Sequence, residues 1–208
     1  MLDIVAKGGW LMWPIIVCSI FSLAIIIERF FYFLTIQVPT SKLLEEIREF
    51  VKKGELKAAI DICSRKDTPV TNIIKAGLLS YDRRREDIKE VFDEVALYEV
   101  PELERNLDFL ATIAHISPLL GLLGTVTGMI KCFYIIQTKS ATLGAVNPAD
   151  LAGGIWEALL TTAAGLAVAI PTLIAYNYFV SKVNFTALEM ERSSRELLGI
   201  ITEEQSRR

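Results

Sequence analysis

Apolar residues gather in three windows of the chain, 8–27, 109–130 and 158–181, and none of these windows contains a charged residue. A helix needs about 20 apolar residues, at about 1.5 Å of rise per residue, to cross the hydrocarbon core of a bilayer. Each window reaches that length. A buried core helix is the alternative for any one window, but charged segments separate all three, which favours membrane spans. With their flanks, the predicted spans cover residues 10–34, 109–137 and 153–180.

The polar segment after the first span carries the periodicity of an amphipathic helix. From Leu43 to Val51, apolar residues recur at i, i+1, i+4, i+7 and i+8, which is one face of a helix. This pattern predicts a helix from Thr40 to Gly54, with Thr40 or Ser41 as its cap and the glycine at its end.

Further helices are expected in the polar segments. Two short ones are predicted at about 55–63 and 70–80. A longer helix begins after Arg85 and is expected to continue into the second span, with a local disturbance at Pro101. The C-terminal segment, 181–208, predicts another amphipathic helix.

The placement of Lys and Arg predicts the topology. Both residue types are frequent in 35–108 and in 181–208, whereas 1–9 and 138–152 each carry a lone lysine. By the positive-inside rule the first two segments are cytoplasmic and the last two lie outside. The chain is therefore predicted to be an all-α membrane protein, with three transmembrane helices and long helices that extend into a cytoplasmic helical domain.

Composition agrees with this class and excludes others. The chain is 52% hydrophobic with a mean hydropathy of +0.40, which is high for a soluble domain of this size. Cys18, Cys63 and Cys132 are scattered singly, which argues against a disulfide framework or a zinc site. The chain has no basic cluster interleaved with aromatic residues, no phosphate-binding glycine loop and no catalytic cluster. We therefore expect no enzyme activity, no cofactor, no metal and no nucleic acid partner.

Small residues mark the second and third windows as packing surfaces. Gly121, Gly124 and Gly128 line one side of the second, and the last two form a GxxxG motif. Gly165 and several alanines serve the same purpose in the third. Small residues let helices approach closely in a bilayer. Packing within the chain and an oligomer interface are both compatible with this pattern.

A few polar residues interrupt these windows, Thr125 and Thr127 in the second and Thr161 and Thr162 in the third. A membrane threonine usually donates its hydroxyl to its own backbone one turn back, and that alternative could hold for all of them. Glu157 differs, because an ionised carboxylate in a bilayer costs at least about 2–3 kcal/mol. It either snorkels to the interface or lines a pore or helix contact, and the small-residue face that continues from it favours the second role.

Aspartate is absent from the three windows, since Asp108 and Asp150 stand only at their ends. If ions cross the membrane here, the main titrating group belongs to another protein.

The span motifs resemble those of the MotA/TolQ/ExbB proton-channel family, and the ExbB/TolQ branch matches best. They are ATIAHISPLLGLLGTVTGMI at 111–130, EALLTTAAGLAVAIPTLIAYN at 157–177 and WPIIVCSIFSLAIIIERFFYF at 13–33. Pro118 and Pro171 belong to these motifs, and we predict a helix-packing role for them as for the glycines.

The resemblance implies a role for each polar residue and a set of partners. Thr125 and Thr162 would line the central pore, Glu157 would stand at the mouth of the third span, and Thr161, a departure from the alanine of many relatives, would widen the polar lining. The resemblance also implies a bacterial inner-membrane protein with a periplasmic N-terminus. It would form a pentamer around an ExbD/TolR-like dimer that carries a membrane aspartate, with a TonB/TolA-like energy transducer as a further partner.

Two other functions compete with an ion-driven motor subunit. A structural membrane scaffold would use its threonines and Glu157 only for packing, and it would tolerate Thr162→Val. A flagellar-type stator subunit usually has four spans, whereas this sequence predicts three, so it ranks lower.

Overall fold

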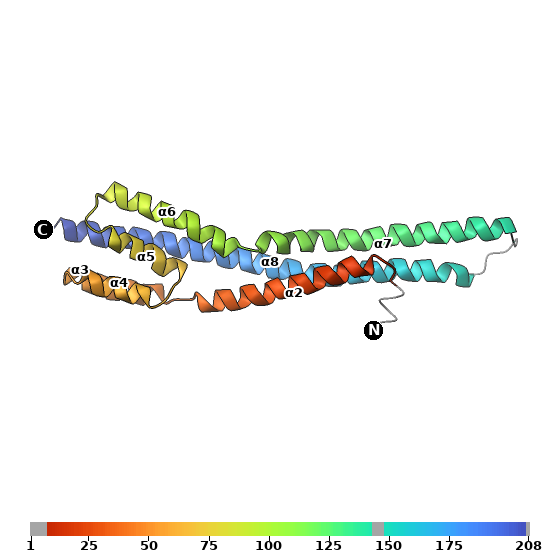
Figure 1. Ribbon diagram of the computed structural model, residues 1–208, viewed down its shortest axis with the longest axis horizontal. Coiled ribbons are helices and arrows are strands. Elements are labelled where there is room, and N and C mark those ends of the chain that lie inside the picture. Colours follow the sequence, from red (N-terminus) through yellow and green to blue (C-terminus); the bar gives the residue numbers. More distant parts are fainter. Residues whose placement is uncertain (1–7, 143–147, 207–208) are drawn as a thin grey trace. The chain divides into compact units, whose positions relative to one another are not determined.

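The computed structural model describes residues 8–142 and 148–206, and every regular element in that part of the chain is a helix (Figure 1). Among the described residues, three helical stretches are long and apolar enough to cross a membrane, Met12–Lys52, Arg85–Lys139 and Leu151–Gln205. These findings confirm the prediction of an all-α membrane protein. The helices are α2 (Met12–Thr35), α3 (Thr40–Lys52), α4 (Leu56–Ser64), α5 (Pro69–Leu79), α6 (Arg85–Glu104), α7 (Leu107–Thr142) and α8 (Pro148–Gln205).

The chain divides into two compact units. The membrane unit comprises residues 1–28 and 106–178, and the amphipathic unit comprises 29–105 and 179–208. The predicted positions of 35–108 and 181–208 on the cytoplasmic side stay predictions. Parts of the predicted outer segments 1–9 and 138–152 lie outside the described residues.

Helix α3 forms where the apolar periodicity predicts it and buries Leu43, Leu44, Ile47 and Val51. Its predicted cap is wrong, because the chain enters the helix at Pro39 without a side-chain cap. The Thr40 hydroxyl instead donates to the Val38 carbonyl at 3.4 Å. Gly54 ends this segment with φ +75°, a left-handed conformation that costs glycine little.

Helix α5 has a complete N-terminal cap. The Thr68 hydroxyl accepts from the Thr71 backbone N–H at 3.3 Å, and the Thr71 hydroxyl accepts from the Thr68 N–H at 3.0 Å. Pro69 follows at the first helical position, where its missing N–H costs nothing. These signals explain why the helix starts within one residue of its predicted position.

The predicted third span and C-terminal helix form one continuous helix, α8. In the amphipathic unit its buried face includes apolar residues that predict an amphipathic tail, namely Val183, Met190, Leu197, Leu198 and Ile201.

The junction of α6 and α7 differs from the prediction. Pro101 lies inside α6, and the helix ends only after Glu104. Asn106 has φ +62°, and its side-chain amide donates to Glu28 Oε2 at 3.1 Å. Asparagine tolerates the left-handed region better than most residues, so the break occurs there and not at the proline.

The aromatic run that follows Arg29 is partly a packing element of the amphipathic unit. Arg29 is buried, donates to the Glu102 carbonyl at 3.2 Å and lies 4.9 Å from the centre of the Tyr32 ring. Phe33 is also buried and stacks on Phe179 with ring centres 5.8 Å apart. Burying a guanidinium costs less free energy when it donates a hydrogen bond to a carbonyl and faces an aromatic ring.

Cys63 offers a test of the packing of α4. The side chain is fully buried, and burial raises the pKa of its thiol to about 11, although nearby Lys75 acts in the opposite direction. Because the thiolate is the reactive form, we expect maleimide labelling at pH 8 to be at least about a hundredfold slower in the folded than in the unfolded protein. Labelling should rise with pH toward the raised pKa. Mass spectrometry of Cys63 with and without denaturant measures this ratio, and equal rates would contradict the packing of α4.

Candidate functional site

Helices α7 and α8 meet in the membrane unit through the predicted packing glycines. A methyl group on Gly121 would lie 3.0 Å from Thr162 Cα, and one on Gly124 would lie 2.0 Å from Thr161 Oγ1. One on Gly165 would lie 2.5 Å from the Ser117 carbonyl oxygen. The structure therefore places these glycines at a contact within one chain.

Gly128 closely approaches the backbone of α8 near the start of that helix. A methyl group there would lie 2.6 Å from the Gly154 carbonyl oxygen and 3.0 Å from Ala158 Cβ. The two prolines of the motifs differ: Pro118 is half-buried in α7, and Pro171 is exposed in α8. A packing role for Pro171 stays a prediction.

The adjacent threonines of α8 have different surroundings. Thr161 is fully buried against Gly124, and its hydroxyl lies 3.0 Å from the carbonyl oxygens of both Glu157 and Ala158. Thr162 is half-buried, and its hydroxyl lies 3.1 Å from its own helix at Ala158 and 3.1 Å from the Gly121 carbonyl of α7. Thr162 therefore bridges the two helices and keeps part of its surface open.

On α7 the two threonines donate only to their own helix. The Thr125 hydroxyl lies 2.7 Å from the Leu122 carbonyl, and that of Thr127 lies 3.1 Å from the Gly124 carbonyl. Both residues are half-buried. A hydroxyl that donates to its own helix can still accept a hydrogen bond from water, so these contacts are compatible with packing and with pore lining.

Glu157 has a partner that sequence reasoning missed. Lys131 of α7 places its Nζ 2.6 Å from Oε1 and 2.7 Å from Oε2 of this carboxylate. Lys131 lies within the predicted second span, directly after its charge-free window, and the sequence pattern predicted no role for it. A lone lysine in a span was the available signal, because intramembrane charges almost always find a partner.

Comparisons with known proteins decide the family. Residues 65–192 match the model of the MotA/TolQ/ExbB proton channel family. The chain belongs to this family. It is 36% identical to the biopolymer transport protein ExbB of Aquifex aeolicus, over 72% of this chain and 93% of that protein.

Other relatives support the ExbB/TolQ branch. An ExbB-like biopolymer transport protein of Synechocystis sp. is 32% identical over 84% of this chain and 82% of its own length. The Tol-Pal system protein TolQ of Pseudomonas aeruginosa is 40% identical over 56% of this chain and 53% of its own length.

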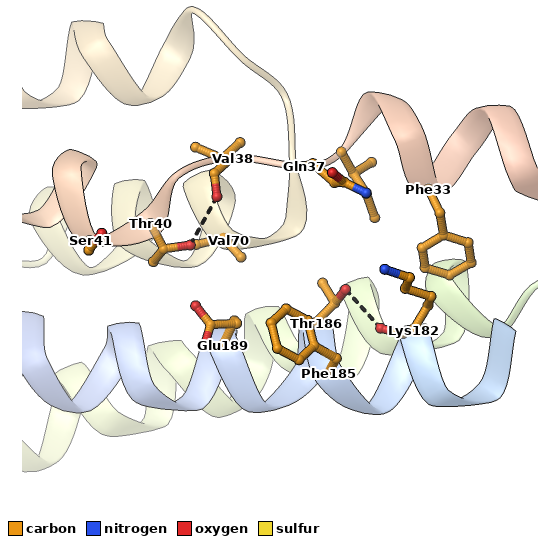
Figure 2. Close-up of a pocket in the computed structure, with 11 residues that line it drawn as sticks. Phe33, Gln37, Val38, Thr40, Ser41, Val70, Lys182, Phe185, Thr186 and Glu189 are labelled. Atoms are coloured by element: carbon orange, nitrogen blue, oxygen red, sulfur yellow. Dashed lines mark hydrogen bonds between the residues drawn. The ribbon is translucent and has the colours of Figure 1, made fainter. Parts of the chain in front are cut away.

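This ExbB/TolQ-branch chain also has a cavity of about 370 Å³ in its amphipathic unit (Figure 2). The connection from α2 to α3 lines one side and α8 the other, with Lys182 and Glu189 contributing opposite charges. The Thr40 and Thr186 hydroxyls in its wall donate to the backbone carbonyls of Val38 and Lys182.

In the described part of the chain, no cluster of three or more His, Cys, Asp or Glu residues could hold a metal ion.

Proposed function

We propose that this chain is the channel subunit of a proton-driven motor of the ExbB/TolQ type in the bacterial inner membrane. It would convert the proton motive force into mechanical work for envelope transport or maintenance. The proposal rests on family membership together with one structural observation. Thr162 is a half-buried hydroxyl at the contact of two membrane helices, where it reaches across to the Gly121 carbonyl.

Threonine hydroxyls suit the wall of such a path. They donate to and accept from water or a carboxyl group without adding a fixed charge. Thr125 and Thr162 are both half-buried and so are the first candidates to line the pore. Thr161 is fully buried in the single subunit, so its pore-lining role would require a different arrangement of α7 and α8.

The acid that carries the proton is proposed to belong to a partner. The three apolar windows contain no aspartate, and Glu157, just before the third, is already bonded to Lys131. An ExbD/TolR-like dimer whose membrane helix carries an aspartate would complete the path inside a ring of this chain, proposed to be a pentamer. Moving one charge through 100 mV supplies about 2.3 kcal/mol, enough to bias the partner helix between two states. A TonB/TolA-like transducer would then receive the work.

The test is proton flux in proteoliposomes. The chain is reconstituted alone and with its aspartate-bearing partner, and flux under an imposed potential is followed with a pH-sensitive dye inside the vesicles. We expect flux only from the complex, because the titrating carboxyl comes from the partner.

A partner with its membrane aspartate replaced by asparagine is the matched control, and it should assemble without conducting. A complex that assembles but passes neither protons nor sodium would overturn the motor proposal and favour a structural scaffold.

A further inference from the structure

The ion pair of Lys131 and Glu157 joins α7 to α8 in the membrane unit. The ammonium lies within 2.7 Å of both carboxylate oxygens. The carboxylate side chain is only 14% exposed, whereas the lysine side chain is 50% exposed. The negative charge is therefore shielded and matched by a positive charge at contact distance.

The turn before α2 closes over the same carboxylate. Gly9 has φ +69°, and a methyl group on it would lie 1.9 Å from Glu157 Oε1 and 2.7 Å from the carboxyl carbon. Glycine adopts this left-handed conformation freely, and it leaves the space that the carboxylate occupies. The turn at Gly9, α7 and α8 thus meet at one side chain.

The pair lies within the predicted spans. Lys131 precedes the predicted outer end at residue 137, and Glu157 follows the predicted start at residue 153, so both lie about 6–9 Å inside the outer boundary at about 1.5 Å of rise per residue. At such a depth a lone charge of either sign is unfavourable, and pairing removes most of that cost. The pairing therefore stabilises each residue more than the same ion pair would at a water-exposed surface.

We infer that Lys131 is a positioning residue which holds Glu157 as a closed ion pair, so that the translocated proton passes without binding to Glu157. This inference rests on the proposed proton flux and assigns the roles of two residues within it. Glu157 fixes the register of α7 against α8 at the outer end of the subunit. The partner's acid is then the titrating group along the path.

The alternative is that Glu157 itself binds the proton. The two roles differ in how the effect of Glu157→Gln depends on residue 131. If Glu157 binds the proton, the Glu157→Gln variant loses proton flux whatever residue stands at position 131. If Glu157 acts through the ion pair, Glu157→Gln lowers proton flux because it leaves the Lys131 ammonium unpaired. Replacing Lys131 as well then restores the flux.

The experiment is a double-mutant cycle in the full complex. Wild type, Lys131→Met, Glu157→Gln and the double variant are reconstituted with the partner, and proton flux is normalised to assembled complex. Each single variant is expected to lose about tenfold, since it leaves a charge without its partner, and the double variant should recover to within about threefold of wild type. The exchange variant, Lys131→Glu with Glu157→Lys, should also recover part of the flux. Lys139→Met controls for loss of a lysine on the same helix.

Three results would overturn the inference. In the first, the double variant conducts as poorly as Glu157→Gln. In the second, the single variants conduct like wild type per assembled complex, which would mean that the pair has a purely structural role. The third concerns thermal stability and applies when there is no flux to measure. If wild type itself does not conduct, the proposed function fails separately. The cycle is then measured on the thermal stability of the complex, and additive effects there would refute the pairing.

Discussion

Thr162→Val is expected to lower proton flux through the assembled complex by at least about tenfold. The substitution keeps the volume of the side chain but removes the hydroxyl that reaches the Gly121 carbonyl at 3.1 Å. It removes one hydrogen bond to that carbonyl, and a hydrogen bond of this kind contributes about 0.5–1.5 kcal/mol. It also removes a half-buried group that could exchange hydrogen bonds with water or with a partner carboxyl. Flux in proteoliposomes, normalised to the amount of complex, measures the effect.

Thr172→Val is the matched control on the same helix. Thr172 is fully buried, and its hydroxyl lies 2.7 Å from the carbonyl of Val168 in its own helix. Its loss should change flux less than about twofold, because a hydroxyl that donates one turn back contributes little. Thr161→Val completes the set and asks whether the fully buried neighbour affects the path. If Thr162→Val conducts like the control, Thr162 is a packing residue.

Helix positions were accessible to sequence reasoning because burial repeats with the helical period. Leu43, Leu44, Ile47 and Val51 form the buried face of α3 as the pattern predicts. Val183, Met190 and Leu197 likewise lie on the buried face of α8, although Phe185 and Leu188 are exposed. Membrane spans are still easier to predict, since a bilayer requires an uninterrupted apolar length. These features depend on residues close together in sequence, so the pattern alone predicts them.

The break between α6 and α7 was not predictable in the same way. Proline is the strongest local signal of a break, yet α6 continues through Pro101. Asn106 takes the left-handed conformation, and its amide reaches Glu28, which is 78 positions away in the sequence. Asparagine's local tolerance of this conformation allows the break there, but the contact with Glu28 joins distant segments, and a local pattern does not contain it.

The candidate site shows the same limit. The glycines and threonines were identified from their residue types, but their surroundings depend on the register of α7 against α8. Neighbouring residues of a helix point about 100° apart, so Thr161 is buried in the helix contact while Thr162 stays half-open. Lys131 contacts Glu157 across 26 positions, which no local pattern reveals.

Gly128→Val is expected to destabilise the membrane unit by about 3 kcal/mol, the upper end of the usual cost of overpacking. The added side chain would begin 2.6 Å from the Gly154 carbonyl oxygen and 3.2 Å from the Ala158 backbone nitrogen. Both atoms belong to the backbone of a rigid helix and cannot rotate away, so α7 and α8 must separate. Separation would also disturb the hydrogen bond from Thr162 to Gly121, which joins the same two helices. Thermal unfolding of the purified protein in detergent, followed by its tryptophan fluorescence, measures the loss.

Gly153→Val separates the clash from the change in helix propensity. Gly153 also lies in α8, and a methyl group there would meet no atom within 4 Å. Both variants replace a helical glycine with valine, so the intrinsic preference changes by a similar amount, and their difference reports packing. Gly128→Ala should fall between Gly128→Val and wild type, because its single methyl group already meets the Gly154 carbonyl. Equal stability of the two valine variants would mean that α7 and α8 do not pack through Gly128. The small residues of the GxxxG motif would then be left to serve contacts between subunits.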